Sequence, residues 1–326
     1  MLVGVGGDPA YQMKSRVFEP IEMDAFYGVR HPRCSPSPEP IMPLDLRPAA
    51  AIVLIIAAAN PVTTANAQAA PPNTNPRQAG CAISPSRCGY PDVTNTGVPA
   101  GTKLTVVKGD LSITKAGAVV DGKDIRGCVE VKAPNVTIRR SKVTCTGYYA
   151  IGSFIESYQG GGLLLEDVEV DCRNRNTTGV GSYGMTARRL NIHGCENGFD
   201  IDDTTSVVDS YIHDLYEGAT GHADGIQLAG GSNIRIMHNT IYAPGGTSAI
   251  ISHPTNNANV LVENNLLAGG AYTLYCPRGH SRDYRVIGNR FGRNFSLKSG
   301  AYGAWTDCRK AAVVRDNFWD NTLKPL

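Results

Sequence analysis

Acidic, imidazole and amide side chains recur at the ends of short apolar segments in the second half of the chain. Between His222 and Gln227, the sequence HADGIQ places an imidazole, a carboxylate and an amide within six positions. Two further carboxylates, Asp200 and Asp202, end the segment GFDID, and His253 ends AIISH. Carboxylates and imidazoles are common proton donors and acceptors in enzymes. These residues predict general acid–base chemistry if the fold brings them to one surface.

The elements that must hold these side chains follow a repeat. Its unit is an apolar residue, two mostly polar residues, a turn residue, any residue and a second apolar residue. First members of successive units lie 20 to 29 residues apart. Strand-like units at this period predict a solenoid in which each unit buries its apolar face against its neighbours. The units are Ile138–Val143, Leu165–Val170, Ala187–Ile192, Val207–Ile212, Ile236–Ile241, Val262–Leu267, Val286–Phe291 and Val314–Trp319, with an earlier copy at Val120–Ile125.

Asparagine occupies the fourth position of the last four units, at Asn239, Asn265, Asn289 and Asn317. Through these asparagines and its variable repeat length, the segment 101–321 resembles the right-handed parallel β-helix of the pectate-lyase-like superfamily, whose second turn carries an asparagine ladder. The resemblance implies an all-β, single-stranded right-handed parallel β-helix of about 8–10 coils with an Asn ladder. It also names the strands: PB2 precedes the asparagine, PB3 follows it, and PB1 follows the T3 turn.

Stacking the PB1 segments in this frame predicts which side chains face outward, because side chains of a strand alternate between its faces. The expected inward residues are Phe199, Ile201, Ile226, Leu228, Ile250 and Leu274. One expected outward column holds Asp200, Gln227, Ile251, Tyr275 and Asp307, and a second holds Asp202, Ala229 and His253. Asp203, His222, Asp224 and Arg278 are expected at the flanking turns.

This concentration of Asp, His, Tyr and Arg predicts a functional site, although any solenoid solvates its outside with polar residues. The expected catalytic residues are Asp200, Asp202, His222, Asp224, His253 and Tyr275. The expected substrate-binding residues are Asp203, Gln227, Arg278 and Asp307.

The segment NGFDIDD, residues 197–203, is similar to the YGFDPHDD-type segment of the mannuronan epimerases, which share this fold. The similarity implies that Asp200 matches the catalytic aspartate of that family. Asn197 stands where that segment has tyrosine, and Asp202 stands where it has histidine. Tyr275 and His253 could supply those two groups from neighbouring coils.

The PB1 residues suit more than one reaction on a polysaccharide. In β-elimination on a uronate polymer, Asp200, Asp202 and Asp224 could hold Ca²⁺ against the substrate carboxylate while a basic or aromatic side chain removes the C5 proton. In inverting hydrolysis, a pair of Asp carboxyls would activate water and protonate the leaving oxygen. We expect a uronate polysaccharide lyase, with an inverting glycoside hydrolase, an epimerase-like enzyme or a non-catalytic glycan-binding surface protein as alternatives.

Eight cysteines follow residue 80, and an even number suits disulfides in an oxidising compartment. Cys145, Cys172 and Cys195 all fall seven or eight residues after the first member of a unit, at the end of PB3. Strands of adjacent coils lie about 4.8 Å apart, within the Cα range that a disulfide accepts. We expect the pairs Cys81–Cys88, Cys128–Cys145, Cys172–Cys195 and Cys276–Cys308, while a Cys145–Cys172 pairing competes with two of these.

The chain is expected to divide into several parts. An apolar run, AAAIVLIIAAA at 49–59, is too short to span a bilayer and is followed by a small-x-small cleavage pattern at 65–67. The expected parts are an N-terminal extension outside the working protein (1–41), a signal peptide (42–67), a flexible linker (68–80), an N-terminal cap (81–100), the β-helix (101–321) and a C-terminal tail (322–326).

The charge of the chain predicts neither nucleic-acid nor membrane binding. Residues 68–326 carry 26 Lys and Arg against 23 Asp and Glu, which is close to balance. With the expected signal peptide and disulfides, we expect a secreted, extracellular monomer whose partner is an extracellular polysaccharide.

Overall fold

The computed structural model describes residues 79–153, 161–219, 221–253, 257–278, 281–308, 311 and 313–326. Contacts divide the chain into Met1–Thr64 and Ala65–Leu326, and every described residue belongs to the second unit. The expected extension (1–41), the signal peptide (42–67) and all but the last two residues of the linker (68–80) lie outside the described residues. In the part of the chain that the structure describes, no helix has the length and apolar character needed to cross a membrane.

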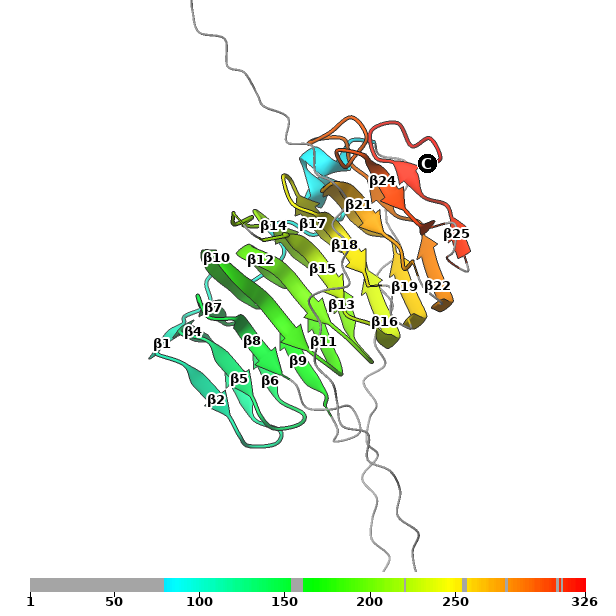
Figure 1. Cartoon of the computed structure of the whole chain (residues 1–326). Coiled ribbons are helices and arrows are strands. Elements are labelled where there is room, and N and C mark those ends of the chain that lie inside the picture. Colours follow the sequence, from blue (N-terminus) through cyan, green and yellow to red (C-terminus); the bar gives the residue numbers. More distant parts are fainter. Residues whose placement is uncertain are drawn as a thin grey trace, which may run out of the picture. The chain divides into compact units, whose positions relative to one another are not determined.

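The described chain is almost entirely parallel β-strand, in an arrangement consistent with a parallel β-helix (Figure 1). We call each succession of strands around the stack a coil and keep the names PB1, PB2 and PB3. PB2 is a separate sheet of nine described strands, which agrees with the expected number of coils. Its strands are β3 (Val119–Asp121), β6 (Thr137–Arg139), β9 (Leu163–Glu166), β11 (Met185–Arg188), β13 (Ser206–Val208), β16 (Gly231–Met237), β19 (Asn257–Glu263), β22 (Ser281–Ile287) and β25 (Val313–Arg315).

PB1 and PB3 form one continuous sheet because two long strands run through both. These strands are β10 (Glu169–Ser182) and β12 (Asn191–Ile201), which begin in PB3 and end in PB1. The other PB1 strands are β2 (Leu111–Ile113), β5 (Val129–Val131), β8 (Tyr149–Ser153), β15 (Asp224–Leu228), β18 (Ser248–Ser252), β21 (Tyr272–Tyr275) and β24 (Gly303–Thr306). The other PB3 strands are β1 (Thr105–Lys108), β4 (Lys123–Arg126), β7 (Lys142–Thr144), β14 (Tyr211–His213), β17 (Thr240–Ala243), β20 (Leu266–Gly269), β23 (Arg290–Phe291) and β26 (Phe318–Trp319).

The repeat predicts the strand register correctly. First members of successive units pair with each other along the whole of PB2, from Val120 with Ile138 to Val286 with Val314. Second members pair in the same way along PB3, as Ile212 does with Ile241. Variable coil length is therefore absorbed by the turns, while the apolar residues stay in register.

The core is one apolar column inside the stack, extending from Ile113 to Cys308. All six PB1 residues that were expected to point inward are at most 1% exposed. At the bend between PB2 and PB3, Asn239 donates through Nδ2 to Oδ1 of Asn265 (3.0 Å), Asn265 to Asn289 (2.9 Å) and Asn289 to Asn317 (3.0 Å). These hydrogen bonds satisfy amides that are almost fully buried, so the bend carries polar side chains at little cost.

Four disulfides join the eight cysteines, and they are the four predicted pairs: Cys81–Cys88, Cys128–Cys145, Cys172–Cys195 and Cys276–Cys308. The last three join adjacent coils at Cα separations of 4.7 to 4.9 Å, the spacing of neighbouring strands. The competing Cys145–Cys172 pairing does not form.

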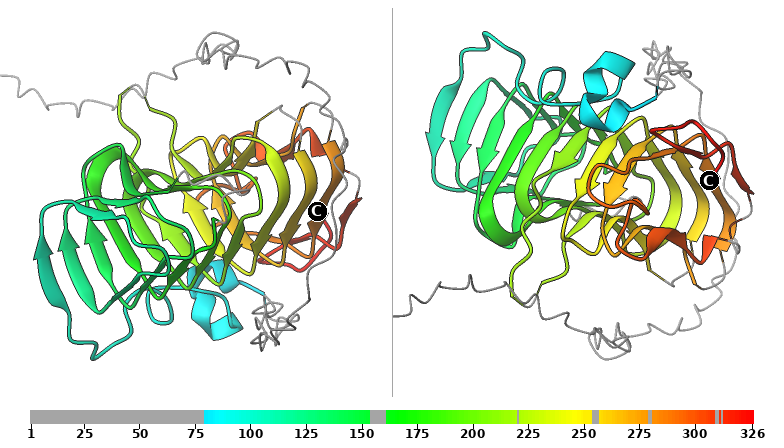
Figure 2. Two further views of the ribbon diagram at one scale, coloured as in Figure 1. Left: turned by 90° about the horizontal axis from the view of Figure 1, so that it is seen from below. Right: turned by 90° about the horizontal axis from the view of Figure 1, so that it is seen from above.

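The segment that was expected to form an N-terminal cap lies along the side of the stack instead (Figure 2). It contains the short 3₁₀ helices η2 (Cys81–Ile83) and η3 (Pro85–Cys88), which pack with Tyr90 against Tyr242, Leu266 and Ala268 of β17 and β20. Tyr242 donates its hydroxyl to the carbonyl of Ala82 (2.8 Å). The apolar PB3 surface of the later coils is thereby covered by residues from the beginning of the described chain.

Candidate functional site

The candidate site lies on the outward surface of PB1, where strand register places the predicted residues in adjacent coils. Asp200 of β12 pairs with Gln227 of β15, Gln227 with Ile251 of β18, and Ile251 with Tyr275 of β21. The predicted column is therefore correct for these four residues. The fifth member was wrong, because Thr306 and not Asp307 pairs with Tyr275.

A local backbone irregularity explains the shift at Asp307. This residue has a left-handed backbone, with φ of 61°, and lies between Thr306, which pairs with Tyr275, and Cys308, which bonds to Cys276. The extra residue moves Asp307 out of the column. Its carboxylate accepts a hydrogen bond from Nε of Arg278 (3.1 Å), so these two expected binding residues pair with each other.

His222 and Asp224 form the first polar contact of the site. Asp224 begins β15 and is 1% exposed, whereas the side chain of His222 is 62% exposed. The carboxylate of Asp224 accepts a hydrogen bond from Oγ of Ser248 and lies 3.3 Å from Nδ1 of His222. The contact with Asp224 raises the pKa of His222 to about 9, which keeps the imidazole protonated at neutral pH. Burial raises the pKa of Asp224, and the bonds from His222 and Ser248 oppose that rise.

A chain of hydrogen bonds links the backbone of Asp224 to His253 through Asn197 and Gln227. The backbone N–H of Asp224 donates to Oδ1 of Asn197 (3.0 Å), which leaves Nδ2 of Asn197 as the donor to Oε1 of Gln227 (3.3 Å). Nε2 of Gln227 then faces Nε2 of His253 at 2.9 Å. Because an amide nitrogen only donates, Nε2 of His253 must accept. The chain therefore fixes His253 as the neutral tautomer with its proton on Nδ1.

The electrostatics of His253 agree with that tautomer. Burial lowers the pKa of His253, and the carboxylates of Asp224 and Asp200 oppose the fall. His222 and His253 thus belong to one network but have opposite pKa shifts. The pKa of His222 is raised, which favours the cation, and the pKa of His253 is lowered, which favours the neutral ring. Titratable groups whose pKa values are pushed apart are the usual basis for assigning an acid and a base.

Asp200 lies beside this network and contacts a tyrosine two coils away. The hydroxyl of Tyr149, on β8, donates to Oδ2 of Asp200 on β12 (3.3 Å). Burial raises the pKa of Asp200, and it also raises the pKa of Tyr149, with a further contribution from the Asp200 charge. The ring of Tyr149 reaches across β10 over Gly181, the residue that pairs with Asp200. Tyr275 is half-buried, which raises its pKa and keeps its phenol protonated.

Asp202 and Asp203 lie at the turn after β12 and are held by backbone contacts. Asp202 accepts the N–H of Asp203 through Oδ1 (2.9 Å), and Asp203 accepts the N–H of Ser232 (2.5 Å). Burial raises the pKa of Asp202. Both carboxylates therefore stabilise the turn toward PB2.

Each of the three aspartates that were expected to hold Ca²⁺ has hydrogen-bond partners of its own. Asp224 is occupied by His222 and Ser248, Asp200 by Tyr149, and Asp202 by its own turn. Within the described ranges, no group of three His, Cys, Asp or Glu side chains is placed to hold a metal ion. Ca²⁺ binding by these aspartates stays a prediction.

Sequence reasoning missed Ser248 and gave Asn197 and Tyr149 no role in orienting the site. Register places Tyr149, Thr178, Asn197, Asp224 and Ser248 in one further column of PB1. A short motif would have revealed most of this column, because a polar residue is followed each time by a small one and then an apolar one. The motif appears as TGV (178–180), NGF (197–199), DGI (224–226) and SAI (248–250).

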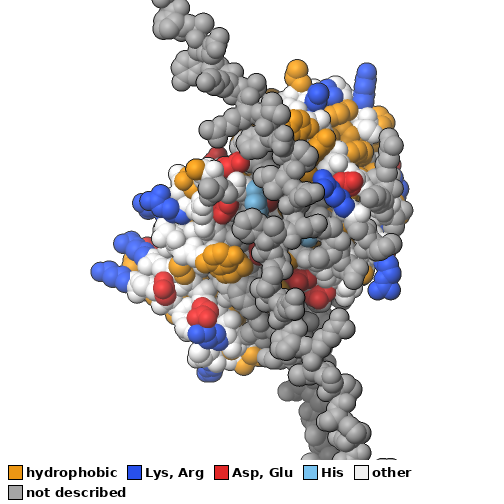
Figure 3. All heavy atoms as spheres, in the orientation of Figure 1, with side chains coloured by type: hydrophobic (Ala, Val, Ile, Leu, Met, Phe, Trp, Pro, Cys, Tyr) orange, Lys and Arg blue, Asp and Glu red, His pale blue; other side chains and the backbone are white. Residues whose placement is uncertain are grey.

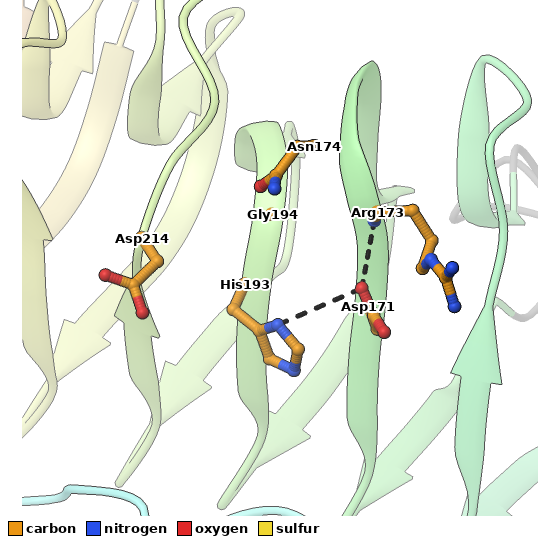
Figure 4. A pocket seen from close by; sticks show the side chains of 6 residues that line it. All are labelled: Asp171, Arg173, Asn174, His193, Gly194 and Asp214. Atoms are coloured by element: carbon orange, nitrogen blue, oxygen red, sulfur yellow. Dashed lines mark hydrogen bonds and ion pairs between the residues drawn. The ribbon is translucent and has the colours of Figure 1, made fainter.

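A second group of titratable side chains lines a pocket of about 600 Å³ at the corner between PB3 and PB1 (Figure 4). Nδ1 of His193 lies 3.9 Å from Asp171, and Asp171 accepts the backbone N–H of Arg173 (2.9 Å). Asn174, Gly194 and Asp214 complete the lining. His193 and Asp171 thus face each other across adjacent coils, and Asp171 also accepts a backbone N–H of its own turn, which explains the positions of these two side chains without a ligand.

Comparison of the chain with known proteins identifies no family. No protein-family model, curated protein or solved structure matches the chain.

Proposed function

We propose that the chain is an extracellular polysaccharide lyase that cleaves a uronate-containing polymer on the PB1 surface. The observation that carries the proposal is the pair of histidines in one hydrogen-bonded network. His222 is held as a cation by the carboxylate of Asp224, and His253 is held neutral through Gln227 and burial. β-Elimination needs both forms at once, a cation for the substrate carboxylate and a neutral base for its C5 proton.

The proposed reaction assigns one role to each group. The exposed imidazolium of His222 pairs with the uronate carboxylate and makes the C5 hydrogen more acidic. His253 takes that proton through Nε2, the electrons of the C5–H bond form the C4–C5 double bond, and the C4–O4 bond breaks. The leaving O4 oxygen takes a proton from the phenol of Tyr275. For His253 to act, the amide of Gln227 must release Nε2, which the rotatable glutamine side chain allows.

Hydrolysis by an aspartate pair has weaker support. An inverting hydrolase needs two carboxyls that both reach the sugar, roughly 6.5–9.5 Å apart. Asp224 is almost fully buried and is bonded to Ser248 and His222, so it is better suited to orient His222 than to contact a substrate.

The proposal includes the location and kinship expected from the sequence. Four disulfides are typical of an oxidising compartment, which supports secretion. A right-handed coil, an asparagine ladder as in the pectate-lyase-like superfamily, and a monomeric state remain part of the proposal. They rest on the sequence resemblance, and the hydrogen bonds from Asn239 to Asn317 support the ladder.

The test is to incubate the purified protein with a panel of uronate and neutral polysaccharides, with Ca²⁺ or with EDTA. Ultraviolet absorbance of unsaturated uronate and release of reducing ends are recorded together, and proton NMR follows the configuration at C5. Both signals rising on one acidic polymer, and lost in His253→Ala, would support the lyase. Reducing ends alone would indicate hydrolysis, inversion at C5 without cleavage would indicate an epimerase, and binding without turnover would indicate a glycan-binding protein.

A further inference from the structure

Two aromatic side chains lie at one end of the polar network, where β8 begins. Tyr148 and Tyr149 are in edge-to-face contact with ring centroids 4.5 Å apart. Tyr149 contacts Asp200, whereas Tyr148 is 77% exposed. The exposed ring of Tyr148 therefore offers a flat apolar surface beside Tyr149, the residue that contacts Asp200.

A second aromatic group lies at the opposite end of the network. Tyr275 ends β21 and is in edge-to-face contact with Tyr272, with ring centroids 5.5 Å apart. Tyr272 in turn lies 5.8 Å from Tyr302, which precedes β24 and is 59% exposed. This group therefore connects a residue of the PB1 column to an exposed ring at the next coil.

One member of each aromatic group, Tyr149 or Tyr275, lies on a PB1 strand of the sheet that carries the histidines. Register carries the surface from β8 through β10, β12, β15 and β18 to β21, which is five steps between adjacent strands. At about 4.8 Å a step, the two groups lie about 24 Å apart. In the space-filling view of this face, hydrophobic side chains gather over β8 and over β21 and β24, with acidic and histidine side chains between them (Figure 3).

We propose that the site binds an extended uronate polysaccharide along the stack axis, with sugar rings stacked on Tyr148 at one end and Tyr302 at the other. This inference rests on the proposed function and extends it to the length and direction of the substrate. Sugar rings have apolar C–H faces that pack on aromatic rings, while their carboxylates need a cation. The surface offers aromatic rings at its two ends and a cation between them, since the cationic His222 lies between the two aromatic groups. A chain of several sugars can therefore contact all three at once, whereas a disaccharide cannot.

The test measures binding and turnover of size-fractionated oligomers from the acidic polymer that the panel identifies, or of polygalacturonate and alginate if none is cleaved. We expect affinity to rise with oligomer length until both ends are contacted. Tyr148→Ala and Tyr302→Ala should each weaken binding of the long oligomer by about 2- to 12-fold, the equivalent of 0.5–1.5 kcal/mol, with no effect on a disaccharide. Tyr148→Phe should retain the affinity, because the ring remains.

Phe295→Ala is the matched control, because Phe295 is an exposed aromatic residue that contacts Tyr242 on the PB3 side. It should leave oligomer binding unchanged. Binding that depends on length and on both tyrosines, without turnover, would support this inference and contradict the proposed lyase. Turnover that is independent of oligomer length and of both tyrosines would overturn this inference while the lyase stands.

Discussion

Gly181 leaves the space that the ring of Tyr149 occupies. A Cβ built on Gly181 would lie 2.5 Å from Cδ1 of Tyr149, a separation that real Cβ atoms do not show. Strand β10 thus has no side chain where the phenol ring crosses it, and this allows Tyr149 on β8 to reach Asp200 on β12. The absence of a side chain at residue 181 therefore joins two coils of the candidate site.

We predict that Gly181→Ala separates the Tyr149 hydroxyl from Asp200. The methyl group must push the ring away, with an overpacking cost of about 1–3 kcal/mol. If the contact positions Asp200 for catalysis, kcat/KM on the substrate polymer falls by on the order of 10²-fold. Tyr149→Phe is the matched variant, because it removes the hydroxyl and keeps the ring. Wild-type kcat/KM in both variants would show that the contact has no role in the reaction.

Stability should fall between neutral and alkaline pH because of His222. Its pKa is raised from 6.5 to about 9 by Asp224, so folding favours the protonated ring. The resulting stabilisation is fully present below pH 6.5 and is lost as pH rises through about 9. Because the imidazole is largely exposed, the contribution should be at most about 1 kcal/mol. Urea unfolding at several pH values, with His222→Gln as the control, measures it, and equal pH slopes for both proteins would contradict the pairing.

Gln227→Glu should reverse the charge preference of His253. A carboxylate at the position of the Gln227 amide would lie beside Nε2 of His253 and favour its protonated form, which raises the pKa of His253. If His253 is the base, the acidic limb of the kcat/KM profile should move to higher pH. Gln227→Met keeps the length without charge and should not move the limb upward. An unchanged limb in Gln227→Glu would exclude His253 as the base.

Asn265→Leu should destabilise the stack strongly. Asn265 accepts from the backbone N–H and from Nδ2 of Asn239, and it donates to Ile236 and Asn289. Leucine has a similar size but leaves buried polar groups without partners, at about 1–3 kcal/mol for each. Chemical denaturation should show a loss of several kcal/mol by that figure. Asp200→Asn, at the outward surface, is the comparison and should change stability little. A midpoint near wild type for Asn265→Leu would contradict a structural role for this column.

Most of the fold could be predicted from the sequence repeat. Apolar residues at fixed offsets, such as Ile236 and Ile241, had to face one interior, so strand register followed from their spacing. Cysteines at equivalent offsets then had to lie opposite each other, and the predicted disulfides formed. The predicted position of residues 81–100 was different from the observed one, because no periodic pattern connects that segment to the apolar PB3 surface around Tyr242 and Leu266 on which it packs.

The sequence by itself determined which strands stack, which side chains leave the core, and that Asp200, Gln227 and Tyr275 share a column. Only the tertiary structure decided what those side chains contact. Asp307 lies outside the predicted column because its own backbone is left-handed, and Asp224 is buried rather than open to solvent. Alternation along a strand gives the side of a side chain, whereas burial and hydrogen-bond partners depend on neighbours two coils away and on turns of variable length. For that reason the tautomer of His253 and the charge of His222 emerge from three-dimensional contacts that no single segment specifies.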